Sequence, residues 1–236
     1  MGREFEREIM LIGEDAVKKL AASKIIVFGV GGVGGYVVES LARSGIGHID
    51  IVDDDQVNEN NINRQIIALH STIGRDKVEV VKERILDINP DCKVETYKVF
   101  FMPEKKDEFD FSKYDYVVDA VDTVKGKIEI IKCANDAKVP VISSMGAGNK
   151  IEASAFEVAD IYKTTMCPLA KVMRKLCKDN KIKKLKVVYS KEKPMMPLEC
   201  EEQSDSRKAV PGSVAFVPSS AGLIIAGEVI KDLIHF

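Results

Sequence analysis

The stretch Lys24-Ile25-Ile26-Val27-Phe28-Gly29-Val30-Gly31-Gly32-Val33-Gly34 decides the fold. Its first half is a short apolar run rich in β-branched residues, which predicts a buried strand over 24–28. Its second half matches G-x-G-x-x-G and leads into a helix expected at about 33–44. Strand, glycine loop and helix in this order are typical of a nucleotide-binding βαβ unit. A glycine turn that serves only close packing is the less favoured alternative.

The glycine loop and the strand after it predict where phosphates and a ribose would bind. Glycines permit a tight turn and a close approach of the backbone to phosphate, and the helix N-terminus offers free N–H groups. The residues expected at the phosphates are Gly29, Gly31, Gly32 and Gly34. Asp53 ends the next strand, expected at 48–53, where a carboxylate accepts hydrogen bonds from ribose hydroxyls. On these features alone, NAD(P) or FAD fits as well as ATP.

Strands and helices alternate over residues 1–150, which predicts an α/β fold of the Rossmann-like, doubly wound kind with a mostly parallel sheet. Two amphipathic helices are expected first, near 3–11 and 13–22. Further strands are expected at 48–53, 93–98, 116–119 and 139–144, and further helices at 75–88 and 124–138. We interpret residues 1–150 as one nucleotide-binding domain.

The pattern changes after Gly146-Ala147-Gly148. A strand at 156–160, a basic helix at 167–179, a strand at 185–190, a strand at 213–217 and a last helix from about 219 to 233 are expected. Residues 191–212 hold three prolines, mixed charge and no periodicity, which predicts a long mobile loop. Residues 151–236 are therefore interpreted as a mixed C-terminal extension of the same fold.

The composition argues against several classes of protein. Of 236 residues, 45% are hydrophobic and 31% are charged, which indicates a soluble globular chain. No run of eighteen apolar residues occurs, so no membrane span is expected. The polar N-terminus predicts a cytoplasmic protein. The five cysteines are odd in number and the chain is not small, so no disulfide framework is expected. They include no Cys-x-x-Cys pair, so no zinc site made of four cysteines is expected either.

Polar residues beyond Asp53 favour ATP over a dinucleotide. A triphosphate that loses pyrophosphate needs cations to neutralise the charge that builds on the leaving group. The chain offers a polar set at Asp55, Asn61, Arg64, Gln65 and Lys77. Asp122 closely follows the strand that ends at Asp119 and is a candidate ligand for Mg²⁺, with capping of the next helix as its alternative role. Taken singly, Arg64 and Lys77 fit ordinary surface charges better than a functional role.

Together these motifs resemble the ubiquitin-activating-like (ThiF/MoeB/HesA) adenylating superfamily. The resemblance covers about residues 3–150 and rests on the glycine loop, Asp53, Asn61-x-x-Arg64-Gln65, Lys77-Val78-Glu79 and Asp122. It implies an ATP-binding adenylation domain that acts on Mg-ATP. It also implies that Asp53 binds the ribose, that Asn61, Arg64 and Lys77 hold the triphosphate, and that Asp122 holds the metal.

Arg7 resembles an arginine that members of this superfamily supply across a homodimer, so a homodimer is expected. A solvated helix face is the alternative for this residue. The resemblance thus assigns catalytic roles to Arg64, Lys77, Asp122 and Arg7.

The C-terminal third resembles the tRNA threonylcarbamoyladenosine dehydratases. The resembling segments are 143–150, 160–175, 187–190 and 211–214. The resemblance implies that a threonyl carboxylate on tRNA attacks the α-phosphate of ATP and that pyrophosphate leaves. The carbamoyl group of the same nucleoside then captures the acyl-adenylate and releases AMP. Capture within one molecule needs no enzyme nucleophile, because proximity supplies a large advantage.

Residues 163–193 carry eleven Lys or Arg and two acids, although the whole chain has a net charge of −2. A basic segment of this kind predicts contacts with RNA phosphates, and a solvated lysine-rich face is the alternative. The candidate RNA-binding residues are Lys163, Lys171, Arg174 and Lys175.

Two other functions stay open. The chain is alternatively an enzyme that adenylates the C-terminal glycine of a ubiquitin-like sulfur-carrier protein, although the lack of zinc cysteines and the basic segment count against it. An NAD(P)-binding redox or sensor module is disfavoured by the cations after Asp53. Cys167 precedes the basic helix and is a candidate nucleophile, but a buried apolar role is favoured. Cys200 is a less favoured acyl acceptor.

Overall fold

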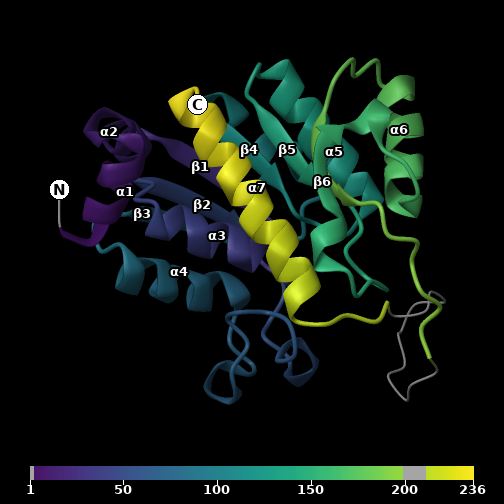
Figure 1. Cartoon of the computed structure of the whole chain (residues 1–236), viewed down its shortest axis with the longest axis horizontal. Coiled ribbons are helices and arrows are strands. Elements are labelled where there is room, and N and C mark those ends of the chain that lie inside the picture. The colour runs from purple at the N-terminus through teal and green to yellow at the C-terminus, as the bar shows by residue number, and fades with distance from the viewer. Residues whose placement is uncertain (1–2, 199–210) are drawn as a thin grey trace.

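A seven-stranded sheet in the order β3-β2-β1-β4-β5-β7-β6 forms the centre of the molecule (Figure 1). The computed structural model describes residues 3–198 and 211–236. Neighbouring strands are parallel from β3 through β7, and β6 runs antiparallel to β7. The strands are β1 (Lys24–Phe28), β2 (His48–Val52), β3 (Lys93–Tyr97), β4 (Tyr116–Asp119), β5 (Val141–Ser144), β6 (Phe156–Asp160) and β7 (Lys186–Ser190). The predicted mostly parallel sheet with a mixed C-terminal extension is confirmed.

Helices cover both faces of this sheet, as in a doubly wound fold (Figure 1). The α-helices are α1 (Glu6–Ile12), α2 (Glu14–Ala22), α3 (Gly34–Arg43), α4 (Lys77–Ile88), α5 (Val124–Asp136), α6 (Pro168–Asp179) and α7 (Phe216–Ile234). Short 3₁₀ helices are η1 (Arg3–Phe5), η2 (Glu59–Asn61), η3 (His70–Thr72), η4 (Pro103–Glu108), η5 (Phe111–Lys113), η6 (Ala153–Ala155) and η7 (Ile161–Lys163). Alternation along β1 divides the core, because Ile25 and Val27 join the cluster with α3, α4 and α7, whereas Ile26 and Phe28 join the cluster with α5.

One predicted strand is wrong. Residues 213–215 form neither helix nor strand, and α7 already begins at Phe216. Pro218 lies in the first turn of α7, where a backbone N–H has no intrahelical partner, so the proline favours a helix start here. The helix also places Val217 in the core with no exposed surface. Part of the predicted loop at 191–212, residues 199–210, lies outside the described residues, and 191–198 contain neither helix nor strand.

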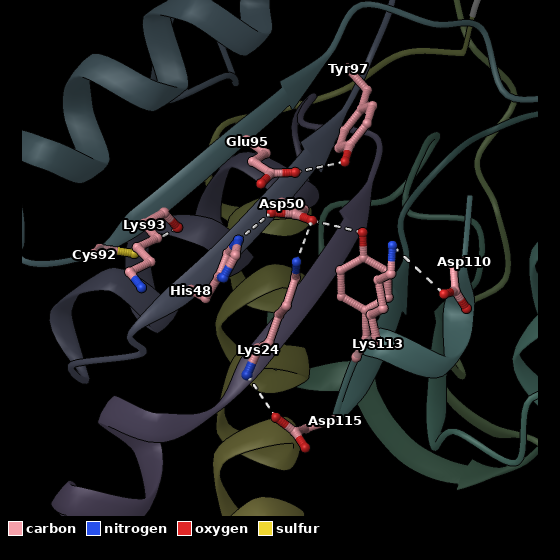
Figure 2. A network of polar contacts seen from close by, with 11 residues as sticks. Lys24, His48, Asp50, Cys92, Lys93, Glu95, Tyr97, Asp110, Lys113 and Asp115 are labelled. Atoms are coloured by element: carbon pink, nitrogen blue, oxygen red, sulfur yellow. Dashed lines mark hydrogen bonds and ion pairs between the residues drawn. The ribbon is translucent and has the colours of Figure 1, made fainter. Parts of the chain in front are cut away.

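A buried polar network lies on the strands next to the chain's N-terminal helices (Figure 2). Asp50 on β2 has no exposed surface. Its carboxylate accepts a hydrogen bond from the Tyr114 hydroxyl at 2.7 Å and lies 2.8 Å from His48 Nε2 and 3.3 Å from Lys24 Nζ. Burial, followed by the hydrogen bond to Asp50, raises the pKa of the Tyr114 hydroxyl. These partners offset the cost of burying a carboxylate.

None of the helices in the described residues is long and apolar enough to cross a membrane. The cysteines within 3–198 and 211–236 are free thiols.

Candidate active site

A cavity of about 630 Å³ opens at the carboxyl edge of the sheet. Its walls come from segments that follow β1 to β5 and from the start of α7. Open α/β sheets bind their ligands at this edge. The predicted ATP-site residues in the lining are Gly29, Gly31, Gly32, Asp53, Asp55, Asn61, Arg64, Gln65, Lys77 and Asp122. The fold therefore brings together nearly all of the residues predicted to bind the nucleotide.

Two glycines hold the loop tightly against its neighbours. Gly29 has a φ of +83°, and a Cβ on it would lie 2.8 Å from the carbonyl oxygen of Ala120. A Cβ on Gly34 would lie 1.8 Å from the carbonyl oxygen of Gly29. Gly34 thus lets α3 start directly against the loop but does not line the cavity. No described side chain caps α3, although the amides of Gly35 and Tyr36 in its first turn donate to the carbonyl oxygens of Gly31 and Val33. The positive end of the helix dipole at this position still favours an anion beside the loop.

Asp53 fixes the glycine loop to the end of β2. Its Oδ2 accepts a hydrogen bond from the Val30 amide at 2.8 Å, and its Oδ1 accepts one from the Asp55 amide at 3.0 Å. Burial raises the pKa of the Asp53 carboxyl, and the nearby Lys77 ammonium only partly opposes this shift. One acidic side chain therefore connects the predicted phosphate loop with the predicted ribose site.

The Asn-x-x-Arg-Gln element forms a compact turn at the cavity wall. Asn61 is buried at the end of η2. The guanidinium of Arg64 donates hydrogen bonds to the carbonyl oxygen of Asn60 at 2.6 Å and to Oδ1 of Asn63 at 2.9 Å. Gln65 Oε1 is buried and has no hydrogen-bond partner among the described residues. A buried acceptor without a donor is costly, so this wall suits a ligand that donates a hydrogen bond.

Lys77 is the first residue of α4, and 4% of its surface is exposed. Its ammonium lies 2.6 Å from Oδ2 of Asp55, and its amide donates to the Asp55 carbonyl at 3.0 Å. The Asp55 side chain is 63% exposed. A phosphate that took the ammonium from Asp55 would therefore leave that carboxylate in water rather than unpaired in the core.

Asp122 is exposed in the cavity wall just before α5. The N-cap residue of α5 is Thr123, and no described side chain makes a capping hydrogen bond there, so the capping role for Asp122 has no support. Across the site, carboxylate oxygens of Asp53, Asp54 and Asp55 lie within 4.8 Å of one another. Carboxylate oxygens are the ligands that Mg²⁺ prefers. The donor set of the cavity thus fits a magnesium ion that accompanies a nucleotide.

Sequence reasoning missed the apolar and backbone parts of this wall. Residues 99–101 follow β3, and 147–148 follow β5. Phe100 is 50% exposed and offers a flat apolar surface in the lining. The order of parallel strands was a usable signal for these segments, because the carboxyl ends of the strands share this edge. The cavity lining also includes Pro211, Ser213 and Pro218. Their position there depends on long-range packing, which a local sequence pattern does not predict.

Asn149 joins both ends of the long segment after β7 beside the cavity. Its amide donates to the Gly212 carbonyl at 2.7 Å, and its Oδ1 accepts from the Gly212 amide at 2.6 Å. Its own carbonyl accepts from the Met195 amide at 2.8 Å. Asn149 has a φ of 58°, a left-handed conformation that asparagine tolerates well. Asn63 donates to the Ser213 carbonyl at 3.0 Å, which ties the same region to the Arg64 turn.

With this geometry in place, comparison with known proteins identifies the family. Residues 5–236 match the ThiF family. The chain belongs to the ThiF family. The resemblance to an adenylating superfamily stated from the sequence is thus confirmed.

Individual relatives of this ThiF family member agree with the dehydratase branch. The chain is 44% identical to the tRNA threonylcarbamoyladenosine dehydratase of Bacillus subtilis, over 99% of this chain and 96% of that protein. It is 40% identical to the Escherichia coli enzyme of the same name, over 72% of this chain and 63% of that protein. The crystal structure of the E. coli enzyme in complex with ATP superposes with a TM-score of 0.90 at 33% identity, covering 99% of this chain and 94% of that one.

The other predicted residues lie outside the cavity lining formed by the described residues. Arg7 is exposed on α1. Lys163, Lys171 and Lys175 are exposed on η7 and α6. Arg174 is half-buried instead and donates hydrogen bonds to the carbonyl, at 2.9 Å, and the hydroxyl of Thr164. This side chain is therefore engaged in holding α6 to η7.

The two cysteines considered from the sequence have different outcomes. Cys167 is 2% exposed and packs in the core beneath α6, which agrees with the favoured apolar role. Cys200 lies outside the described residues.

Proposed function

We propose that this chain is an ATP-dependent adenylating enzyme that dehydrates threonylcarbamoyladenosine in tRNA. One observation carries the proposal: a single cavity in a ThiF family chain gathers the glycine loop, Asp53, Arg64, Lys77 and Asp122. Relatives with this activity in their names, and an E. coli relative crystallised with ATP, support the same conclusion.

The residues divide the nucleotide between them. The loop of Gly29, Gly31 and Gly32 and the uncapped start of α3 receive the phosphates. Asp53 accepts hydrogen bonds from the ribose, and the half-exposed ring of Phe100 offers an apolar surface for the base.

Cations stabilise the leaving group. The Lys77 ammonium exchanges Asp55 for the triphosphate, and the Arg64 guanidinium, already oriented by two hydrogen bonds, faces the developing charge on pyrophosphate. Asn61 completes the turn that presents Arg64. Asp122, with the carboxylates near Asp53, would hold Mg²⁺, and the ion would add further charge neutralisation on the phosphates.

The reaction needs no enzyme nucleophile. The threonyl carboxylate attacks the α-phosphorus of ATP, a phosphorus–oxygen bond breaks, and pyrophosphate leaves. The carbamoyl group of the same nucleoside then attacks the activated carbonyl and expels AMP, with loss of one proton. The ring closes with the net removal of one water from the nucleoside. The burial of Cys167 agrees with a path that uses no thiol.

The exposed lysines of η7 and α6, Lys163, Lys171 and Lys175, bind tRNA phosphates in this proposal. A substrate of this kind places the enzyme in the cytoplasm. Arg174 helps indirectly, by fixing the helix that carries two of these lysines.

The enzyme acts as a homodimer. On α1, the exposed Arg7 lies beside Met10 and Leu11, which are 86% and 84% exposed. Large apolar side chains this exposed favour a covering partner. In this proposal a second copy covers these side chains, and Arg7 serves the cavity of that copy.

The deciding experiment incubates the enzyme with Mg-ATP and tRNA that bears threonylcarbamoyladenosine. AMP and pyrophosphate are quantified, and the nucleosides are analysed by mass spectrometry. We expect loss of one water per nucleoside, coupled to one AMP. Unchanged tRNA, with AMP formed only when a ubiquitin-like sulfur carrier with a C-terminal glycine is added, would contradict the dehydratase assignment and leave adenylation intact.

A further inference from the structure

A fully buried charged cluster underlies the turn that carries Asp122. Lys127 on α5, Asp119 at the end of β4 and Ser143 on β5 have no exposed surface. The Lys127 ammonium lies 3.2 and 3.1 Å from the two carboxylate oxygens of Asp119. The Ser143 hydroxyl donates to Oδ2 of Asp119 at 2.5 Å. Each charge in the cluster is thus paired and hydrogen-bonded.

The fold builds this cluster at a position that touches the cavity. Strand register places Asp119 directly between Phe28 of β1 and Ser143 of β5. Gly126 lets α5 begin close by, because a Cβ there would lie 2.9 Å from the Phe101 carbonyl oxygen. A buried ion pair is seldom more stabilising than well-packed apolar residues of the same volume. Stability alone therefore does not account for charges at this place.

The cluster holds the main chain immediately before Asp122. The Lys127 ammonium donates to the Val121 carbonyl at 3.0 Å, and Oδ1 of Asp119 accepts from the Val121 amide at 3.3 Å. Both backbone polar groups of Val121 are therefore hydrogen-bonded to members of the ion pair. Asp122 is the next residue and projects from this fixed peptide at the cavity wall. A shift of the pair would move the Asp122 carboxylate with it.

We propose that Lys127, Asp119 and Ser143 are positioning residues that fix the location of the Asp122 carboxylate relative to Mg-ATP. This inference rests on the proposed function, because that function gives Asp122 its role. None of the three residues touches the nucleotide: they act through the peptide of Val121. Misplacement of a reacting group by about 1 Å lowers rates by about 100-fold. Loss of the cluster therefore lowers kcat more than it weakens ATP binding.

The test uses the double variant Asp119→Asn/Lys127→Met, which removes both charges and leaves no unpaired buried ion. We expect a folded protein whose kcat for AMP formation with threonylcarbamoyladenosine-bearing tRNA falls roughly 10- to 100-fold, with KM for ATP little changed. The same changes in an Asp122→Asn background should have almost no added effect, because they act through that carboxylate. Additive losses, or full kcat in the folded double variant, would overturn the inference.

Two further variants keep the test decisive. Ser143→Ala retains both charges and removes one hydrogen bond, so it should show a smaller loss of kcat that also disappears with Asp122→Asn. Glu39→Gln/Arg84→Met removes an ion pair between α3 and α4 away from the cavity, and should keep kcat even if melting occurs at a lower temperature. Full activity of Asp122→Asn alone would refute the proposed role of Asp122, and the inference with it. An inactive Asp122→Asn beside a fully active, folded cluster variant would refute the inference alone.

Discussion

The backbone amide of Val30 donates a hydrogen bond of 2.8 Å to Oδ2 of Asp53. This bond joins the glycine loop to the residue that is predicted to bind the ribose. Loop geometry and ribose recognition consequently depend on one carboxylate. The same carboxylate has a raised pKa, caused first by burial. Its protonation therefore bears on nucleotide binding.

As the pH is lowered, we expect ATP binding to weaken at a higher pH than it would if Asp53 had the pKa of an ordinary aspartate. As pH rises, the unfolded chain loses this proton near the ordinary pKa of 3.8 and the folded chain loses it later. Between these two values the Asp53 contribution to the free energy of unfolding falls as pH rises, while ribose binding improves. KM for ATP measured across this window should fall with increasing pH. Asp53→Asn should bind ATP more weakly and lack this dependence, and persistence of the dependence in the variant would contradict the assignment.

Replacing Lys77 with methionine should abolish most activity without unfolding the protein. The apolar side chain fills the buried site, and Asp55, the former partner, is 63% exposed. Loss of one preorganised cation at the leaving group should lower kcat/KM for ATP by about 100-fold. AMP formation and thermal melting are the measurements. The control is Lys138→Gln, an exposed lysine between α5 and the start of β5, at the amino ends of the strands. Equal losses of kcat/KM in both variants would count against the proposed site.

Mixing two inactive variants tests whether Arg7 serves the partner subunit. Arg7→Ala keeps its own Lys77, and Lys77→Met keeps its own Arg7. In a mixed dimer, one of the two sites then has both groups intact. Random assortment of subunits should therefore restore about a quarter of wild-type activity. No recovery after subunit exchange, shown by a tag on one variant, would place Arg7 outside the partner's site.

Charge removal on α6 should affect RNA binding and not the use of ATP. Lys171→Gln and Lys175→Gln should each reduce the salt dependence of tRNA affinity by about one unit of slope. KM for ATP should stay constant. Arg174→Gln should behave differently, since it breaks the bonds to Thr164 and lowers the melting temperature instead. A tRNA affinity unchanged by both lysine variants would contradict an RNA-binding role for this face.

Gly34→Ala should be among the most destabilising single changes in the glycine loop. The added Cβ would meet the Gly29 carbonyl at 1.8 Å, and backbone on both sides has little room to move. We expect a loss of about 3 kcal/mol or more in the free energy of unfolding. Gly227→Ala on α7 is the matched control, because nothing lies within 4 Å of its added Cβ. That control should gain about 0.5 kcal/mol from helix propensity, as measured by chemical denaturation.

Much of the fold follows from local pattern, and much of the site from strand order. The apolar run before Gly29 and the positions of Asp53 and Asp122 locate three carboxyl strand ends, which a parallel sheet must bring together. The predicted start of α7, at about residue 219, is wrong, because the apolar residues Val214, Phe216 and Val217 fit a short strand equally well. Lys127 resembles any surface lysine on an amphipathic helix, and its burial arises only when β1, β4 and β5 align. Arg174 likewise becomes half-buried through Thr164, ten residues earlier.

Asn149 is hydrogen-bonded to Met195 and also to Gly212. The interval of chain between these two residues therefore begins and ends at the same residue. The entropy of closing such an interval grows only with the logarithm of its length, at about 0.6 kcal/mol for each doubling. The anchor at Gly212 lies between Pro211 and Ser213 in the chain, so the side chain of Asn149 also holds this part of the cavity wall in place, whatever the length of the interval.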